Sequence, residues 1–162
     1  MIAEDYVKSL GMHPHPEGGY YLENYRSGMD IHPDGFEGFR SACTSIYFLL
    51  EKGQFSALHR IKSDEIWHFY EGGPLEIIEI SPEGKHSITT LGRNILAEEK
   101  LSYVVQAGNW FASRPMTGSE FSLVGCTVAP GFDFQDFEMP DRNWFLEKFP
   151  EHSSLIRVLT HL

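Results

Sequence analysis

The stretch GQFSALHRIKSDEIWHFYEG, from Gly53 to Gly72, decides the fold, because its side chains change face with the two-residue period of a β-strand. From Phe55 to Ile61 every second residue shares a face, and this places His59 among apolar neighbours. The segment Lys62–Asp64 can turn the chain before the next run begins. The sequence therefore predicts two consecutive strands at the centre of the chain.

The second of these strands carries a carboxylate on the face that we expect to be buried. Glu65, Trp67 and Phe69 share one face, and His68 lies on the other. If the first face points inward, Glu65 returns toward His59 across the sheet. An imidazole and a carboxylate inside an apolar interior are costly unless they pair, bind a ligand or hold a metal. The spacing therefore predicts a pocket.

The rest of the chain has the texture of an all-β protein. Runs rich in Ile, Val, Phe, Tyr and Thr are divided by Gly, Pro and Asn, a pattern typical of short strands joined by turns. We expect strands at Tyr20–Arg26, Cys43–Leu50, Phe55–Ile61, Glu65–Tyr70, Leu75–Ile80, His86–Leu91, Leu101–Val105 and Phe121–Val128, and a further barrel strand in the acidic and aromatic run Phe132–Glu138.

Both ends of the chain show helical spacing. Ile2, Tyr6 and Leu10 recur every four residues before Gly11, which predicts a short N-terminal helix that ends at a glycine cap. From Asp141 onward the spacing is helical again, and this predicts short C-terminal helices. No repeat or linker divides the 162 residues, so we expect one domain over residues 1–162.

The charge balance argues against two classes of partner. Thirteen Lys and Arg against 23 Asp and Glu give a net charge of −10, which leaves no basic face for nucleic acid and repels anionic lipid. No apolar run approaches the roughly 20 residues of a membrane span. The N-terminus lacks the order of a secretory signal, and Cys43 and Cys126 form no CxxC pair. We expect a cytoplasmic protein with reduced thiols.

The central stretch resembles the first motif of the cupin superfamily, which reads G, five residues, HxH, three or four residues, E, six residues, G. Gly53, His59, Glu65 and Gly72 occupy those places. Ile61 stands where the motif has its second histidine. The resemblance implies that this chain keeps one histidine and one glutamate of the motif.

Other segments extend the resemblance over most of the chain. Gln106–Gly108 is similar to the start of the second cupin motif, and Phe111 stands where that motif has its histidine. HPEGGYYLENYRS (His15–Ser27), ALHRIKSDEIWHFYEGGPLEI and VGCTVAPGFDFQDFEM resemble an uncharacterised family, the fifth cupin family. The resemblance implies a double-stranded β-helix, or jelly-roll barrel, similar in fold to dTDP-sugar 3,5-epimerases. It also implies a homodimer.

Few of the usual metal ligands are present. Cupin metals are usually held by two histidines and a glutamate of the first motif and one histidine of the second, and only His59 and Glu65 remain here. We therefore expect no cofactor; a metal, if bound, would be held by these two residues. His68 points away from Glu65 by strand parity. Prolines flank His13 and His15, which favours structural roles for both.

Without a metal, the residues fit proton transfer on a bound carbonyl compound. His59 fits the base, and Ala57–His59 resembles the segment that carries the catalytic histidine in the sugar epimerases. Tyr47, Tyr70 and Tyr103 are candidate acids on neighbouring strands. These residues favour an isomerase or epimerase acting on a carbonyl or nucleotide-sugar-like substrate.

Two other functions stay open at this point. Glu65 either orients His59 and contacts the ligand, or forms a satisfied core pair with it and no turnover follows. The second case describes a cupin that binds a small metabolite without chemistry. A metal-dependent enzyme with an incomplete ligand set is the third hypothesis.

Further candidate ligand contacts are aromatic or charged. Arg26 and Glu17 belong to the N-terminal segment that matches the family, and Arg26 either approaches an anionic ligand or pairs with an acid, as does Arg40. His68 is a further candidate contact. Four aromatic residues either stack on a flat ligand or fill the core: Trp67, Phe69, Trp110 and Phe111.

Overall fold

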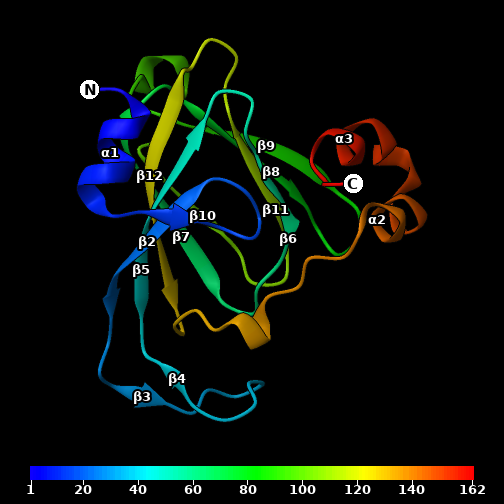
Figure 1. Cartoon of the computed structure of the whole chain (residues 1–162). Helices are drawn as coiled ribbons and strands as arrows, with labels where there is room; N and C mark the ends of the chain where they lie inside the picture. The colour runs from blue at the N-terminus through cyan, green and yellow to red at the C-terminus, as the bar shows by residue number, and fades with distance from the viewer.

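A computed structural model describes all 162 residues, and its two main antiparallel sheets face each other as a jelly-roll barrel (Figure 1). The larger sheet has six strands in the order β1-β2-β5-β12-β7-β10. These strands are β1 (His13–Pro14), β2 (Tyr20–Arg26), β5 (Thr44–Glu51), β12 (Phe121–Ala129), β7 (Asp64–Gly72) and β10 (Ser102–Val105).

The second sheet has four strands in the order β6-β11-β8-β9, and a small hairpin of β3 and β4 projects from the lower end of the barrel in Figure 1. The strands are β6 (Ser56–His59), β11 (Trp110–Pro115), β8 (Leu75–Ile80), β9 (His86–Leu91), β3 (Asp30–Ile31) and β4 (Arg40–Ser41). The predicted all-β class and jelly-roll barrel are confirmed.

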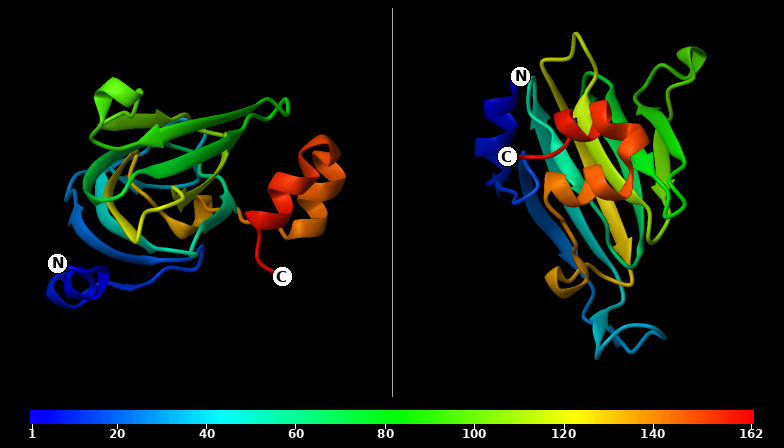
Figure 2. Two further views of the ribbon diagram at one scale, coloured as in Figure 1. Left: turned by 90° about the horizontal axis from the view of Figure 1, so that it is seen from above. Right: turned by 90° about the vertical axis from the view of Figure 1, so that its right-hand side faces the viewer.

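Short helices cover the outer faces of the two sheets (Figure 2). Near the N-terminus, α1 (Ala3–Leu10) contacts β5 and ends at Gly11, whose φ of 69° is the left-handed cap expected of a glycine. On the far side, α2 (Arg142–Lys148), η3 (Pro150–His152) and α3 (Ser153–Val158) pack against the four-stranded sheet. No helix combines the length and apolar character needed to cross a membrane.

Side chains on the inner faces of the strands fill the barrel, and side chains on the outer face of the four-stranded sheet pack against the helices. One cluster of 12 buried residues, which includes Trp67, Phe111 and Val124, packs between the sheets. A second cluster joins Trp110 and the β8 isoleucines to Phe145 and its helical neighbours. Each of these buried side chains contributes about 1.5–3 kcal/mol of hydrophobic stabilisation. Phe111 and Trp110 are adjacent in β11, so their side chains point to opposite faces of the sheet and belong to different clusters.

Two strand predictions are wrong. β11 was not predicted because its first four residues are buried on both faces of the strand, so the sequence shows no alternation of apolar and polar residues. The run Phe132–Glu138 is not a barrel strand: it is a loop that contains the 3-10 turn η2 (Phe134–Asp136). Its phenylalanines Phe132 and Phe137 pack against the interior cluster instead of pairing in a sheet.

The path between β6 and β7 also differs from the expected hairpin. β6 pairs with β11, whereas β7 pairs with β12 and β10. The four residues between them, Arg60–Ser63, therefore carry the chain from one sheet to the other. His59 and Glu65 face each other across the barrel interior and not along one sheet.

A buried ion pair anchors the loop around η2. The Arg40 guanidinium makes two bonds of 2.8 Å to Asp136, and the two side chains are only 1% and 6% exposed. The carbonyl oxygens of Glu37 and Phe39 accept from the same guanidinium. Arg40 therefore stabilises this loop and does not line the cavity.

We expect Asp136→Asn to lower the free energy of unfolding by about 2 kcal/mol, because hydrogen bonds to charged groups contribute about 1.5–3 kcal/mol. Asn keeps one acceptor for Arg40, which cannot lose its proton. Thermal unfolding measures this as a Tm about 4–8 °C lower. Glu138→Gln is the matched control: it removes a partner of Arg60 whose side chain is 51% exposed, so a loss below 1 kcal/mol is expected. Equal losses would contradict the anchoring role.

Candidate functional site

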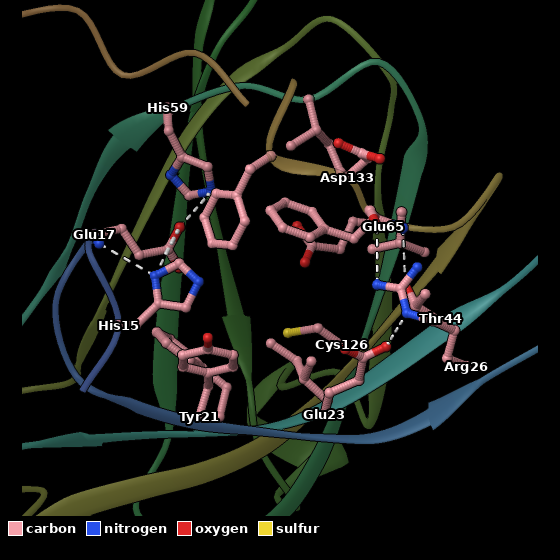
Figure 3. Close-up of a pocket in the computed structure, with 16 residues that line it drawn as sticks. His15, Glu17, Tyr21, Glu23, Arg26, Thr44, His59, Glu65, Cys126 and Asp133 are labelled. Atoms are coloured by element: carbon pink, nitrogen blue, oxygen red, sulfur yellow. Dashed lines mark hydrogen bonds and ion pairs between the residues drawn. The ribbon is translucent and has the colours of Figure 1, made fainter. Parts of the chain in front are cut away.

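A cavity of about 450 Å³ lies inside the barrel, between the six-stranded sheet, the end of β6 and the loop around η2 (Figure 3). β2, β5, β7 and β12 form its walls through side chains on their inner faces. Its size falls in the range of about 300–1,000 Å³ typical of small-molecule sites. Half of its 16 lining residues are hydrophobic, and the rest include several acids and two histidines.

One end of the cavity holds an ion pair between His59 and Glu17. His59 Nε2 lies 2.9 Å from Glu17 Oε2, and both side chains are more than nine-tenths buried. On the other side of the ring, Nδ1 lies 2.7 Å from the carbonyl oxygen of Ala57, so Nδ1 carries a proton and donates it. Both nitrogens of His59 therefore have partners within the protein.

The pair holds opposite charges despite its burial. Burial opposes the charged form of His59, but the Glu17 carboxylate outweighs it, so the pKa of His59 is raised. Burial likewise opposes the Glu17 carboxylate, and His59 outweighs it, so the pKa of Glu17 is lowered. Both shifts favour an imidazolium beside a carboxylate in this pair.

A tight turn between β1 and β2 places Glu17 in the barrel together with His15. The backbone N–H of Glu17 donates to His15 Nδ1 at 3.1 Å. Burial lowers the pKa of His15, which is therefore neutral with its proton on Nε2. Gly18 closes the turn at φ 114°, and a Cβ there would lie 2.0 Å from the carbonyl oxygen of Phe55. The close approach requires glycine.

Glu65 lies in the middle of the cavity and carries a strongly shifted carboxyl. Its pKa is raised to about 8 by burial and by the charge of Glu17, while His59 and a hydrogen bond with the Cys126 thiol oppose the shift. The residue is 8% exposed. Burial also raises the pKa of Cys126 well above its usual value. At pH 7 Glu65 is therefore a neutral carboxylic acid that can both donate and accept a hydrogen bond.

A second set of charged residues, Arg26, Glu23 and Asp133, lies at the other end of the cavity. Arg26 Nε bonds Glu23 at 2.5 Å, and its Nη2 donates to the carbonyl oxygen of Phe132 at 3.1 Å. Asp133 accepts from the backbone N–H of Gln135, which lowers its pKa. In Figure 3 these groups lie opposite the His59–Glu17 pair, with Glu65 between the two ends.

The structure places the three candidate tyrosines outside the cavity. Tyr47 and Tyr70 lie on the outer face of the six-stranded sheet, with ring centroids 6.0 Å apart. Tyr103 points into the barrel, but its hydroxyl donates to Glu79 at 2.5 Å, and Asn109 donates to the other Glu79 oxygen. None of the three tyrosines lines the cavity.

The aromatic candidates also lie outside the lining. Trp67 and Phe111 are 1% exposed in the core between the sheets, and Phe69 packs against the same cluster. Trp110 lies on the opposite side of β11, beneath the Arg60 guanidinium. His68 is on the outer face and pairs with the Thr127 hydroxyl at 3.1 Å. Strand parity alone did not distinguish a core position from a cavity wall.

Of the predicted contacts, His59, Glu65, Glu17 and Arg26 line the cavity together. Sequence reasoning missed His15, Glu23, Cys126 and Asp133. His15 and Glu17 lie in a glycine-rich turn, and only the turn geometry brings them beside His59. The one available signal was the match of their segment to the N-terminal part of the cupin family.

The residues at the usual cupin metal positions do not fit a metal. Both nitrogens of His59 already have partners. Ile61 lines the cavity where the motif has a histidine, and the ring of Phe111 packs 4.1 Å from that of His59 where the second motif has one. No group of three His, Cys, Asp or Glu side chains is arranged to hold a metal ion.

A jelly-roll barrel with a ligand-sized cavity inside it is the architecture of a cupin. More specifically, the chain belongs to the family described as Cupin superfamily (DUF985), whose sequence model matches residues 4–140. A search of curated proteins gives no significant match.

Solved structures agree with this assignment. A protein from Shewanella oneidensis is 39% identical over 99% of this chain and 98% of its own, with a TM-score of 0.92. A hypothetical protein from Leishmania major is 33% identical over 100% of both chains, with a TM-score of 0.94. A cupin 2 domain-containing protein from Halorhodospira halophila shares the fold alone, at 15% identity over 93% and 88% of the chains and a TM-score of 0.58.

Proposed function

We propose that this cupin binds a small carbonyl compound and moves a proton next to its carbonyl group without a metal, as an isomerase or epimerase does. One observation carries the proposal: the cavity contains two buried carboxyls whose pKa values are shifted in opposite directions, Glu17 downward and Glu65 upward. Such a pair supplies a base and an acid at the same pH.

The two carboxyls take different roles in this scheme. The Glu17 carboxylate accepts a proton from the carbon beside the carbonyl, the electron pair of that C–H bond forms a carbon–carbon double bond, and the π pair of the carbonyl moves onto its oxygen. The Glu65 hydroxyl donates a hydrogen bond to that oxygen as its charge develops. Glu17 then returns the proton to the former carbonyl carbon, while Glu65 gives its proton to the oxygen of that carbon and takes the proton of the neighbouring hydroxyl, which gives an isomer. An epimer forms only if the first carbon is reprotonated on its opposite face.

His59 acts in this scheme as a positioning residue. The expectation from the sequence was a free histidine base, but its Nε2 is bonded to Glu17 and its pKa is raised. A protonated ring cannot accept a further proton. Its positive charge instead holds Glu17 in place and offsets the negative charge that passes to the ligand.

Binding without turnover is the second candidate, because a specific observation favours it. The His59–Glu17 pair is satisfied within the protein, and a satisfied pair also serves a cavity that only captures a metabolite. A homodimer and a cytoplasmic location stay predictions. So does the likeness to sugar epimerases.

A deuterium-exchange assay separates turnover from binding. The wild-type protein is incubated in D₂O with D-glucose, D-mannose, D-fructose and dihydroxyacetone, and ¹H NMR follows the C–H signals beside each carbonyl. We expect at least one compound to lose that signal faster than in a protein-free blank. A compound that binds for hours with no exchange would support the binding module and contradict the enzyme.

A further inference from the structure

Every cation of the cavity lining is already paired with a carboxylate. Arg26 is bonded to Glu23, and the imidazolium of His59 is bonded to Glu17. The second histidine, His15, is neutral because it is buried and accepts a backbone N–H. The lining therefore contains no positive charge that lacks a carboxylate partner.

The acids outnumber the cations in the same lining. Glu17, Glu23 and Asp133 carry three negative charges against the two of Arg26 and His59. The whole chain adds to this imbalance with a net charge of −10. A phosphate that enters must approach these carboxylates, and the arginine that it meets is already paired with Glu23 and about half exposed to water, so the attraction of Arg26 for it is weak.

The remaining groups suit an uncharged polar ligand. The Glu65 carboxyl is more than nine-tenths buried, faces the cavity, and has the Cys126 thiol as its hydrogen-bonding partner. A ligand hydroxyl can accept a hydrogen bond from its O–H and donate one to its carbonyl oxygen. Tyr21, Phe48 and Phe132 add aromatic walls around it, and such rings stack on the apolar C–H faces of a small ring compound.

We propose that the cavity takes an uncharged, hydroxyl-bearing compound of monosaccharide size and discriminates against its phosphorylated and nucleotide-linked counterparts. This inference deepens the proposed function and rests on it for the choice of site. It also narrows the substrate class expected from the sequence, in which a nucleotide-sugar-like compound was included. The volume of about 450 Å³ agrees with a ligand of this size.

Binding of matched pairs tests the inference. Saturation-transfer NMR and calorimetry are carried out with D-glucose, D-mannose and D-galactose, with their 6-phosphates, and with UDP-glucose. We expect at least one free sugar to bind and its phosphate to bind at least tenfold more weakly. Equal or tighter binding of a phosphate or of UDP-glucose would overturn the inference, and so would the failure of every free sugar to bind.

A gain-of-affinity variant provides a second test. Glu23→Gln leaves Arg26 without its carboxylate partner, so we expect the preference for the free sugar over its 6-phosphate to shrink at least tenfold. Glu138→Gln removes the same charge outside the cavity and should leave the preference unchanged. Identical effects of the two variants would show that the net charge of the chain, and not the lining, sets the preference.

These outcomes are separable from failure of the proposed function. A free sugar that binds with the expected preference but exchanges no deuterium contradicts the enzyme and leaves the ligand class intact. Exchange that occurs only in a phosphorylated sugar contradicts the ligand class and leaves the acid and base roles intact.

Discussion

Replacing Glu65 by glutamine is expected to raise the free energy of unfolding by about 3 kcal/mol at pH 7. The folded protein holds this carboxyl protonated up to a pKa of about 8, against an ordinary value of 4.5. Each pH unit between these values costs the folded state about 1.4 kcal/mol. Glutamine is uncharged at any pH and has nearly the same shape, so the cost disappears.

The sign of the pH dependence follows from proton counting. Between pH 4.5 and 8 the folded state keeps a proton on Glu65 that the unfolded state has lost, so this group makes stability fall as pH rises. Glu17, His59 and Cys126 face Glu65 and are retained in the variant. The gain from Glu65→Gln should therefore be near zero at pH 4.5, grow with pH, and level off above 8.

Urea unfolding at pH 5, 7 and 8.5 measures this gain. Glu120→Gln is the control, because Glu120 is a glutamate on the surface with a side chain 76% exposed, and its effect on stability should be below 1 kcal/mol. A Glu65→Gln protein that is less stable than wild type at pH 8.5 would contradict a neutral carboxyl in the cavity.

Glu17→Gln is expected to slow deuterium exchange by about 10²–10⁴-fold, the contribution typical of a general base. Glutamine cannot accept the proton, although its oxygen can still accept a hydrogen bond from His59. The measurement is the exchange rate of the sugar that the wild-type protein turns over. Its affinity for that sugar should change much less than the rate, because the cavity walls are intact.

Two further variants distinguish a role of Glu17 as the base from a purely structural role. Glu17→Asp keeps a carboxylate and should recover part of the rate, whereas a purely structural role would not distinguish aspartate from glutamine. His59→Asn removes the imidazolium and should lower the rate through Glu17, with a raised pKa in the pH–rate profile. Exchange by Glu17→Gln within tenfold of wild type would contradict Glu17 as the base.

Strand alternation was enough to predict most of the barrel. β2, β8 and β9 begin and end where the sequence places them, because turn residues bound each apolar run. β11 was missed since Trp110 packs under the helices while Phe111 faces the interior, so both faces are apolar. The loop around η2 was misread as a strand because its phenylalanines alternate with acids, although they pack as separate contacts.

The site was only partly predictable for a different reason. Parity correctly placed His59 and Glu65 on inward faces, because burial follows the period of two. It did not show that Glu17, 42 positions before His59 in sequence, reaches the same cavity through a turn that depends on Gly18. Nor did it separate Tyr103, which is bonded to Glu79, from a free acid.

A titration of Glu65 shows whether the cavity contains the proposed acid. The side-chain carboxyl carbons of glutamate are labelled with ¹³C and titrated by NMR, and Glu65→Gln identifies the signal. We expect a midpoint near 8, about 3.5 units above the ordinary pKa of 4.5 for a glutamate side chain. A midpoint below about 5 would mean that Glu65 is an ordinary carboxylate at pH 7, and the proposed acid would not exist.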